Sequence, residues 1–464
     1  MGNELQKKYG LITAICMVFG IVVGSGVFFK AEKVLTATGG NLPLGIMAWV
    51  VGGLIMIVCA YTFAVMATRY EKVNGIVDYA EATCGERYGY FVGWFMATIY
   101  LPTLTSVLAW VSARYTLVLF GSDDITGGTC LALTLFYLVG SYAVNALSPV
   151  LAGKLQVGTT FIKLVPLLLM AIVGTIVGLS NGLLIENFTS VPTTAEILGV
   201  KEGYEPATSA LLTAVVATAF AYEGWIIATS INAELKDAKK NLPRALIGGT
   251  LLVMIVYILY YVGLAGAADN MTMIAGGEAG AKIAYSNILG SAGGTIIFVF
   301  VVISCLGVLN GLMLGCCRGL YALAARGRGP KPEVFSQVDK VTNMPTNSAI
   351  AGVMLCAFWM LYFYGANLTA SWFGPFSFDT SEIPIVTIYA IYVPIFINMM
   401  RKEKELGGLK RFVMPFLAIC GSAFMVYAAF FAHGAATVGC YLIVFAVISA
   451  IGMAFYKKGN SDKL

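Results

Sequence analysis

The sequence predicts an all-α integral membrane protein that crosses the bilayer twelve times. Hydrophobic residues make up 59% of its 464 residues and charged residues only 11%, whereas ordinary soluble domains contain about 25% charged residues. Twelve apolar runs have the ~20-residue length that a spanning helix needs, and the mean hydropathy of the chain is +0.83. This composition excludes a soluble globular enzyme, a disordered chain and a fibrous protein.

The apolar runs follow one another through short polar connections. Because the bilayer holds no water to satisfy backbone N–H and C=O groups, runs of this length must be helical. The longest connections, near 180–207 and 318–346, are shorter than the ~50 residues of a soluble domain, so residues 1–464 are expected to form a single domain. The runs lie at residues 11–37, 44–68, 91–120, 129–147, 155–179, 208–231, 245–268, 294–317, 347–364, 383–400, 412–432 and 436–456.

Basic residues set the predicted orientation, because cytoplasmic connections are enriched in Lys and Arg. If both termini face the cytoplasm, most of the 29 Lys and Arg residues lie on the cytoplasmic side. A missed or additional helix would scramble this asymmetry, so the asymmetry supports twelve spans. The exceptions are Lys30, Lys33, Lys201 and Lys282 in outer connections, and Arg114 and Lys163 within runs.

Two of the runs are interrupted in mid-span. The first reads GIVVGSGVFF, with Gly24, Ser25 and Gly26 at its centre, and the sixth reads TAFAYEGWII, with Glu223 beside Gly224. The two runs are five helices apart, so they cross in opposite directions. Interrupted segments in corresponding positions of two halves indicate an inverted repeat with the binding site at the breaks. We therefore predict repeats at 11–179 and 208–400, followed by two additional helices at 412–456.

The chemistry of the breaks favours a zwitterionic ligand. A Gly-Ser-Gly break frees backbone N–H groups at the start of the second half-helix, where the positive dipole end suits a carboxylate. Carbonyl groups freed at the ends of the preceding half-helices suit an ammonium group. Close helix packing is the alternative explanation for a single small-residue motif, and the paired break in the sixth run is what favours a site.

Ionisable residues within the runs are functional candidates, because a charge at a helix centre costs ~2.5–3.5 kcal/mol or more. Lys163 lies midway along the fifth run, where its ammonium group would tie carbonyl groups of the first run to the eighth; snorkelling to the nearby interface is the alternative. Glu223 carries a proton, pairs with a cation or points to water, and the sequence does not choose among these roles. Arg114 is expected to be an interfacial anchor.

Metal, nucleotide and enzymatic sites are not expected. The ten cysteines include no CxxC pair, and the single histidine, His433, excludes an HExxH metal site and a Ser-His-Asp triad of spanning residues. No Gly-Lys-Ser/Thr sequence is present, so ATP-driven pumping is not expected. The net charge of +5 comes from loops and does not indicate nucleic-acid binding. We expect no metal, no cofactor and no nucleic-acid partner, and a location in the cell membrane.

The most distinctive motifs of the first eight runs are GSGVFF (24–29), KLQVGTTFIKL (154–164), FAYEGW (220–225), ELKDAKKNLPRA (234–245), and GVLNG with the following RGLYALAARGRGP (307–330). In these motifs and their order, the chain resembles members of the amino acid–polyamine–organocation superfamily. Within it the chain is similar to the L-type amino acid transporter family and its bacterial serine/threonine and alanine exchangers. The last four runs match that family only in length and spacing. The resemblance implies a LeuT-type fold, in which 5+5 inverted repeats are followed by two helices.

The resemblance also implies a substrate site. The family binds the substrate carboxylate at N–H groups of the first break and the substrate amine at carbonyl groups of both breaks. An aromatic residue of the second break closes over the substrate. The corresponding residues are Ser25 and Gly26 for the carboxylate, with Gly24 providing the turn; Val22, Phe220 and Glu223 for the amine; and Phe220 for the aromatic gate.

The implied activity is sodium-independent exchange of neutral L-amino acids by alternating access, without enzymatic chemistry. Lys163 matches the buried lysine that stands in for sodium in the family. Relatives commonly carry Asp or a small residue at the position of Glu223, so this longer acid narrows the pocket or favours proton coupling. Eukaryotic members pair with a heavy chain through an outer-loop cysteine. Cys130 lies too close to the fourth run for that role, and the short termini are typical of bacterial members, so no heavy-chain partner is expected.

Two other function classes were compared with exchange. A proton-coupled permease for cationic amino acids or another amine, such as a polyamine, is kept as the alternative because of Glu223. A channel or a ligand-sensing receptor is disfavoured, because the chain has no soluble module and two of its predicted helices are broken.

Overall fold

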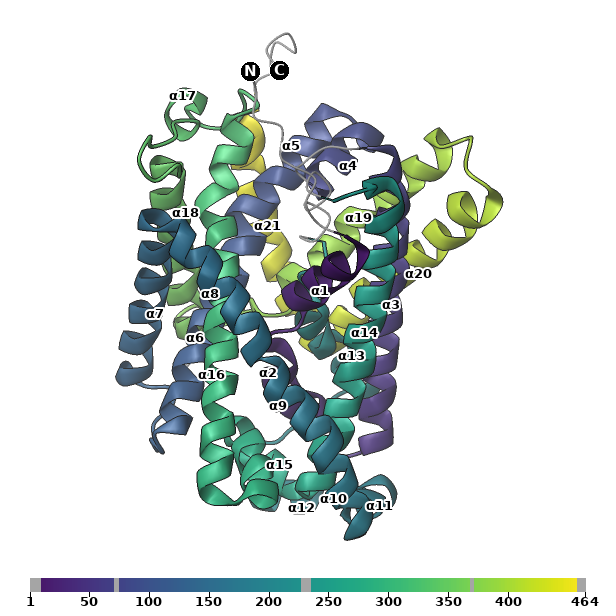
Figure 1. Cartoon of the computed structure of the whole chain (residues 1–464), viewed down its shortest axis with the longest axis vertical. Coiled ribbons are helices and arrows are strands. Elements are labelled where there is room, and N and C mark those ends of the chain that lie inside the picture. The colour runs from purple at the N-terminus through teal and green to yellow at the C-terminus, as the bar shows by residue number, and fades with distance from the viewer. Residues whose placement is uncertain (1–9, 71–74, 227–234, 368–370, 457–464) are drawn as a thin grey trace.

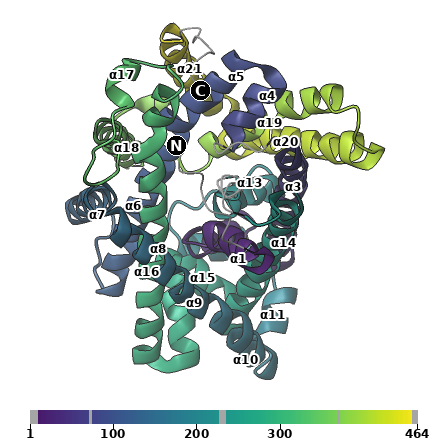
Figure 2. The same ribbon diagram turned by 45° about the horizontal axis from the view of Figure 1, so that its top comes forward.

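The computed structural model describes residues 10–70, 75–226, 235–367 and 371–456, and its elements are helices (Figure 1). Most of the long helices run along the long axis of the molecule. Two short helices, α1 (Leu11–Val22) and α13 (Ala210–Tyr222), lie near the centre (Figures 1 and 2). This arrangement follows from the apolar composition, since helices satisfy every backbone group within one segment.

The remaining helices precede or follow α13 along the chain. Before it lie α2 (Gly26–Ala37), α3 (Leu42–Arg69), α4 (Ile76–Cys84), α5 (Glu86–Phe95), α6 (Leu101–Leu119), α7 (Gly128–Leu147), α8 (Pro149–Ile162), α9 (Leu164–Leu169), α10 (Thr175–Ser180), α11 (Leu183–Thr189) and α12 (Thr194–Val200). After it lie α14 (Ala238–Ala267), α15 (Asn270–Gly276), α16 (Gly280–Ala324), α17 (Pro332–Phe335), α18 (Thr346–Ala366), α19 (Ile383–Lys402), α20 (Met414–His433) and α21 (Ala435–Ala454). Short π-helical stretches are η1 (Met96–Tyr100), η2 (Met170–Gly174) and η6 (Leu409–Val413), and 3-10 turns are η4 (Gly277–Ala279) and η5 (Gly374–Phe376).

Nine helical segments of the described chain are long and apolar enough to cross a membrane, or up to ten if one bent pair counts as a single span. They coincide with the second to fourth and the seventh to twelfth predicted runs. The prediction of an all-α, multi-pass membrane protein is confirmed, whereas a count of twelve spanning helices is not. The first, fifth and sixth runs account for the difference. The first and fifth are built from shorter helices, and the described helix of the sixth ends at Tyr222.

The first and sixth runs are interrupted where the sequence predicts. α1 ends at Val22 and α2 begins at Gly26, and α13 ends at Tyr222 with a turn over residues 223–226. The predicted continuation of the sixth run, to residue 231, lies outside the described residues. These breaks explain why neither run qualifies as one uninterrupted span.

The fifth run differs from the uninterrupted helix that the sequence predicts. It consists of α8, α9, η2 and α10, with Lys163 at the junction between α8 and α9. Beyond α10 the chain turns by 88° into α11. The connection at 180–207, which the sequence presents as a polar loop, therefore contains two short helices.

Glycines allow the fifth run to pack closely on α14. A Cβ atom added to Gly174 would lie 2.4 Å from the carbonyl oxygen of Gly263, and one added to Gly178 would lie 2.2 Å from the Cα atom of Gly266. Small residues at such crossings let two helix backbones meet. Because α14 also contacts α1 and α3, this packing positions the fifth run beside the centre of the molecule.

Ion pairs join the chain after α16 to α4 and α5. The guanidinium group of Arg326 contacts the carboxylates of Asp78 and Glu81, the latter at 3.1 Å. Arg328 lies 3.0 Å from the carboxylate of Glu86. Both arginines belong to the set that the sequence places on the cytoplasmic side, so part of that charge is used in contacts between helices.

Candidate substrate-binding site

The break between α1 and α2 lies in the interior of the protein. Ser25 is 1% exposed and Val22 is 5% exposed. α16 packs directly against this break, because a Cβ atom on Gly24 would lie 2.3 Å from a methyl carbon of Val308. Gly24 therefore allows close helix packing, as the alternative explanation of the motif requires. The helix is nevertheless interrupted at this position, so both explanations apply.

The two broken segments meet backbone to backbone. A Cβ atom on Gly26 would lie 2.5 Å from the Cα atom of Ala221 and 3.2 Å from the carbonyl oxygen of Phe220. The start of α2 thus lies against the last turn of α13. The next turn contains Gly224 with a φ of +103°, a conformation that L-residues rarely adopt.

A tyrosine of α14 joins the two breaks. The hydroxyl group of Tyr257 lies 3.1 Å from the carbonyl oxygen of Val22 and 3.1 Å from that of Ala221, and it donates a hydrogen bond to them. The ring of Tyr257 stacks on Tyr222, with 5.4 Å between the ring centroids. One fully buried side chain therefore holds the ends of α1 and α13 together.

The first turn of α2 presents backbone N–H groups to this junction. The first N–H groups of any helix have no partner within the helix. In the part of the chain that the structure describes, the amides of Ser25 and Gly26 form no hydrogen bond to another backbone group. With Phe29 N–H bound to the carbonyl of Ser25, these amides form the N-terminus of a helix with a positive dipole end, suited to a small anion.

Aromatic rings and a buried cation cover one side of the junction. The rings of Phe29 and Phe220 meet edge to face with 5.7 Å between centroids. The ammonium group of Lys30 lies 4.9 Å from the first centroid and 5.3 Å from the second. Lys30 is fully buried and lies 2.5 Å from the carboxylate of Glu382, which also contacts His433 at 3.1 Å. The sequence does not predict this cluster.

Lys163 is buried and reaches the first broken segment. It is 2% exposed, and its ammonium group donates a hydrogen bond to the carbonyl oxygen of Gly20 in the last turn of α1. The predicted connection to the first run is thus present. A hydrogen bond to the eighth run, the other half of the prediction, does not occur among the described residues.

Glu223 caps the end of α13 and is 7% exposed. Its Oε1 atom accepts a hydrogen bond from the hydroxyl group of Tyr100. Its Oε2 atom is buried and has no hydrogen-bond partner in the described part of the chain. A buried carboxylate oxygen without a partner is costly, so this atom is available to a ligand, a proton or water.

The sequence does not predict two residues of this site, Tyr257 and Tyr100. Tyr257 lies in the apolar stretch MIVYILYYV, where nothing distinguishes it from its neighbours. Tyr100 ends the π-helical stretch η1, and such stretches often occur at functional sites. Pro102, two residues later, is the only local signal of this irregularity.

No group of three or more His, Cys, Asp or Glu side chains suited to a metal ion occurs within the described ranges. The site is instead built from backbone amides, carbonyl groups, aromatic rings and the buried ionisable side chains of Lys30, Lys163, Glu223 and Glu382. Together with the many apolar helices, these features define a multi-pass membrane protein in which two interrupted segments meet in the interior.

Comparison with known proteins identifies the family. A model of the amino acid permease family matches residues 9–455, and the chain therefore belongs to that family. The serine/threonine exchanger SteT of Bacillus subtilis is 30% identical over 431 residues, covering 91% of each chain. The resemblance to the L-type transporters within the amino acid–polyamine–organocation superfamily is thus confirmed.

Two mammalian relatives match a smaller part. The human large neutral amino acids transporter small subunit 2 is 28% identical over 345 residues, covering 74% of this chain and 62% of its own length. The rabbit (Oryctolagus cuniculus) b(0,+)-type amino acid transporter 1 is 28% identical over 346 residues, with coverages of 74% and 68%. These relatives are transporters rather than enzymes, in agreement with the class that the sequence predicts.

Proposed function

We propose that this amino acid permease is a sodium-independent exchanger of neutral L-amino acids that works by alternating access in the cell membrane. The observation that carries the proposal is the meeting of two broken helices at a buried junction. There the amides of Ser25 and Gly26 have no backbone hydrogen-bond partner among the residues that the structure describes. The relative named a serine/threonine exchanger supports exchange as the mode of transport.

The substrate would bridge the two breaks. Its carboxylate would accept hydrogen bonds from the amides of Ser25 and Gly26, with Gly24 providing the turn. Its ammonium group would bind carbonyl oxygens at the ends of α1 and α13, among them those of Val22, Phe220 and Glu223. Each carbonyl has two lone pairs, so the hydrogen bond from Tyr257 leaves Val22 able to accept another. Gly224 lets the chain turn away immediately behind this position.

Two buried side chains complete the proposed cycle. The ammonium group of Lys163 would supply, through its contact with Gly20, the positive charge that a sodium ion supplies elsewhere. The ring of Phe220 would close over the substrate, since it already lies against Phe29 and Lys30. Alternating access then requires these aromatic contacts to open on one side at a time.

The proposed topology places both termini in the cytoplasm and needs no heavy-chain partner. The thiol group of Cys130, the cysteine nearest the outer connection after α6, is fully buried in α7. A buried thiol is not available for a disulfide bond to another chain. The charge asymmetry of the connections supports the orientation.

Counterflow tests the proposal. Proteoliposomes preloaded with an unlabelled neutral amino acid should take up labelled L-threonine faster than empty ones, in sodium-free buffer. A panel of L-serine, L-alanine and L-leucine as internal substrates would rank the preferred side chain. An uptake rate that does not depend on the internal amino acid, but depends on a pH gradient, would contradict exchange.

Removing the hydroxyl group of Tyr257 should weaken substrate binding. Tyr257→Phe leaves the carbonyl groups of Val22 and Ala221 without their donor, and losing such a buried hydrogen bond costs ~1–3 kcal/mol. We therefore expect the dissociation constant of L-threonine to rise about tenfold, equivalent to ~1.4 kcal/mol. Tyr427→Phe on the exposed side of α20 is the matched control. Unchanged binding in Tyr257→Phe would mean that the spacing of the two breaks does not depend on this bridge.

The alternative function, a proton-coupled permease for cationic amino acids or other amines, is favoured by one observation. The Oε2 atom of Glu223 is buried beside the second break, and no described residue forms a hydrogen bond with it. Such an oxygen suits a proton or a second cationic group. The Glu223 side chain is therefore the position at which the two functions differ.

Glu223→Gln separates them. If the chain is an exchanger of neutral amino acids, the variant should keep its counterflow rate within about threefold, because the proposed substrate contact uses the backbone carbonyl. If the chain is a proton-coupled permease, the variant should lose the dependence of uptake on a pH gradient. Glu205→Gln, in an exposed connection, is the control. The measurement is uptake of L-threonine and L-lysine over a series of imposed pH gradients.

A further inference from the structure

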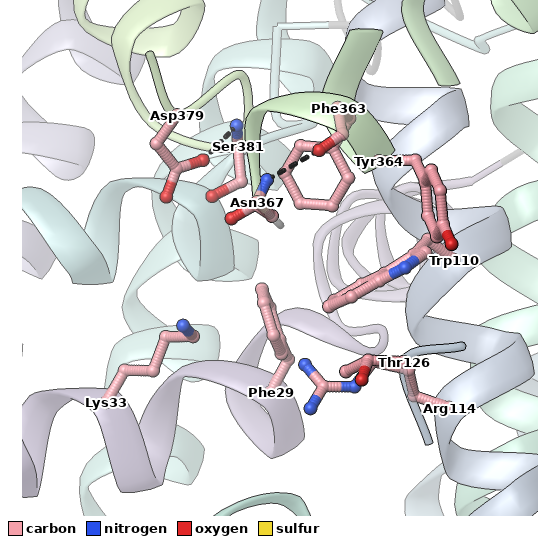
Figure 3. Close-up of a pocket in the computed structure, with 10 residues that line it drawn as sticks. All are labelled: Phe29, Lys33, Trp110, Arg114, Thr126, Phe363, Tyr364, Asn367, Asp379 and Ser381. Atoms are coloured by element: carbon pink, nitrogen blue, oxygen red, sulfur yellow. Dashed lines mark hydrogen bonds between the residues drawn. The ribbon is translucent and has the colours of Figure 1, made fainter. Parts of the chain in front are cut away.

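A cavity with a volume of about 260 Å³ lies beside the candidate site (Figure 3). It is enclosed by α2, α6, the end of α18 and the segment that precedes α19. Its volume is far larger than the ~30 Å³ share of one water molecule. The charge pattern of the connections places this cavity on the predicted outer side.

The wall between this cavity and the breaks is made of side chains. Phe29 lines the cavity, and its ring also packs against the ring of Phe220 at the second break. Ser381 also lines the cavity, and its hydroxyl oxygen accepts a hydrogen bond from Lys30 at 3.1 Å. A ring pair and a buried ion pair, that of Lys30 with Glu382, thus separate the cavity from the two breaks.

Opposite charges face each other across the cavity. Figure 3 shows Asp379 and Ser381 on one wall, with Lys33 and Arg114 on the other. Lys33 has no carboxylate within ion-pair distance among the residues described, and its ammonium group lies 5.2 Å from the ring centroid of Phe29. The carboxylate of Asp379 accepts one backbone hydrogen bond, at 2.6 Å from the amide of Ser381. Both charged groups are only half-buried, so they can exchange water for a ligand.

Arg114 and the aromatic side chains complete the cavity. The guanidinium group of Arg114 lies 4.3 Å from the ring centroid of Trp110 and 2.5 Å from the carboxylate of Glu278. Its Nε atom is buried and has no hydrogen-bond partner in the described part of the chain. Trp110 packs edge to face on Phe363 with 5.1 Å between centroids. The site therefore offers an apolar surface between its positive and negative walls.

We propose that this cavity is an outer subsite for a zwitterionic α-amino acid on its way to the breaks. The carboxylate of the ligand pairs with Lys33 and Arg114, its ammonium group pairs with Asp379, and its side chain lies on Trp110 and Phe363. The proposal rests on the proposed function, because the ligand is the transported substrate. Half-exposed ion pairs each contribute little to affinity, so binding is weak, with a dissociation constant on the order of 1 mM. Weak binding suits a transient site, because the substrate must dissociate from it to reach the breaks.

Binding stoichiometry tests the subsite. Equilibrium dialysis of the purified full-length protein with labelled L-threonine should reveal a tight and a weak binding event. Asp379→Asn should remove the weak event and keep the tight one, because Asp379 makes no contact with the breaks. Asp123→Asn, in the exposed connection between α6 and α7, should keep both. Equal stoichiometry in the wild type and in Asp379→Asn would overturn the subsite.

Chemical protection provides a second, independent measurement. Thr126 is exposed at the cavity, and a Thr126→Cys variant should react with a membrane-impermeant maleimide at a rate that millimolar L-threonine lowers at least about threefold. L-threonine amide and N-acetyl-L-threonine each lack one charge and should protect less. Labelling that L-threonine does not slow would overturn the subsite. Failure of counterflow in the wild type would overturn the proposed exchange instead, and the two failures are therefore distinguishable.

Discussion

Gly26→Ala is expected to weaken amino acid binding severely, although it adds a single methyl group. The new carbon atom would lie 2.5 Å from the Cα atom of Ala221 and 3.2 Å from the carbonyl oxygen of Phe220. Backbone atoms cannot rotate aside as a flexible side chain can, so α2 and α13 must move apart. Overpacking of this kind costs ~1–3 kcal/mol. Because the proposed contacts to carboxylate and ammonium group come from both segments, we expect the affinity for L-threonine to fall about 100-fold, equivalent to ~2.7 kcal/mol.

The measurement is equilibrium binding of labelled L-threonine to the purified variant, together with counterflow in proteoliposomes. Gly248→Ala on α14 is the matched control, because its new carbon atom would meet only the side chain of Ile15, at 3.6 Å. The affinity of this control variant for L-threonine should stay within about twofold of the wild-type affinity. Elution as a single species in size-exclusion chromatography would separate a lost site from a misfolded protein.

Ser25→Ala tests whether the backbone or the side chain binds the carboxylate. This variant removes the hydroxyl group and keeps the amide N–H, which is the proposed donor. We expect its affinity for L-threonine to stay within about threefold of the wild type. A loss as large as that of Gly26→Ala would assign the carboxylate to the hydroxyl group and contradict the helix N-terminus as the anion site.

The breaks were predictable because their cause is local. Glycines at positions 24 and 26, in mid-span of an apolar run, weaken the helix wherever the rest of the chain packs, and Gly224 does the same in the sixth run. The second to fourth and the seventh to twelfth runs were predictable for an equally local reason, since their apolar length leaves no structure but a helix. These features required no knowledge of which segments lie side by side.

The features that the sequence did not predict depend on contacts between distant segments. Arg114 looked like an interfacial anchor, and the structure pairs it with Glu278, 164 positions later. Tyr257 and Tyr100 lie in apolar stretches, and only their partners at the breaks distinguish them. Lys163 was predicted to be functional, but the end of α8 beside it was not, although Pro166 lacks the N–H that would bond the carbonyl of Ile162 in a continuous helix.

Lys163→Ala is expected to reduce counterflow at least about tenfold while the protein remains as stable as the wild type, or more stable. Burying an ammonium group within a membrane span costs ~2.5–3.5 kcal/mol, and Lys163 is 2% exposed. A lysine that only contributed to packing would be replaceable by an apolar residue with a gain in stability and no loss of transport. The contact with the carbonyl oxygen of Gly20, one turn before the break, is the reason to expect a loss instead.

Lys154→Ala provides the control, because Lys154 lies on the exposed surface of the same helix, α8. If Lys163 only snorkelled to the interface, the two variants would behave alike, with counterflow near the wild-type rate. The two measurements are the initial rate of counterflow per molecule of reconstituted protein and the midpoint of thermal unfolding. A fall in rate without a fall in midpoint assigns the loss of transport to the missing charge, because a misfolded variant would lower both together. Full activity of Lys163→Ala would remove the lysine from the proposed site and, with it, the proposed reason that transport needs no sodium.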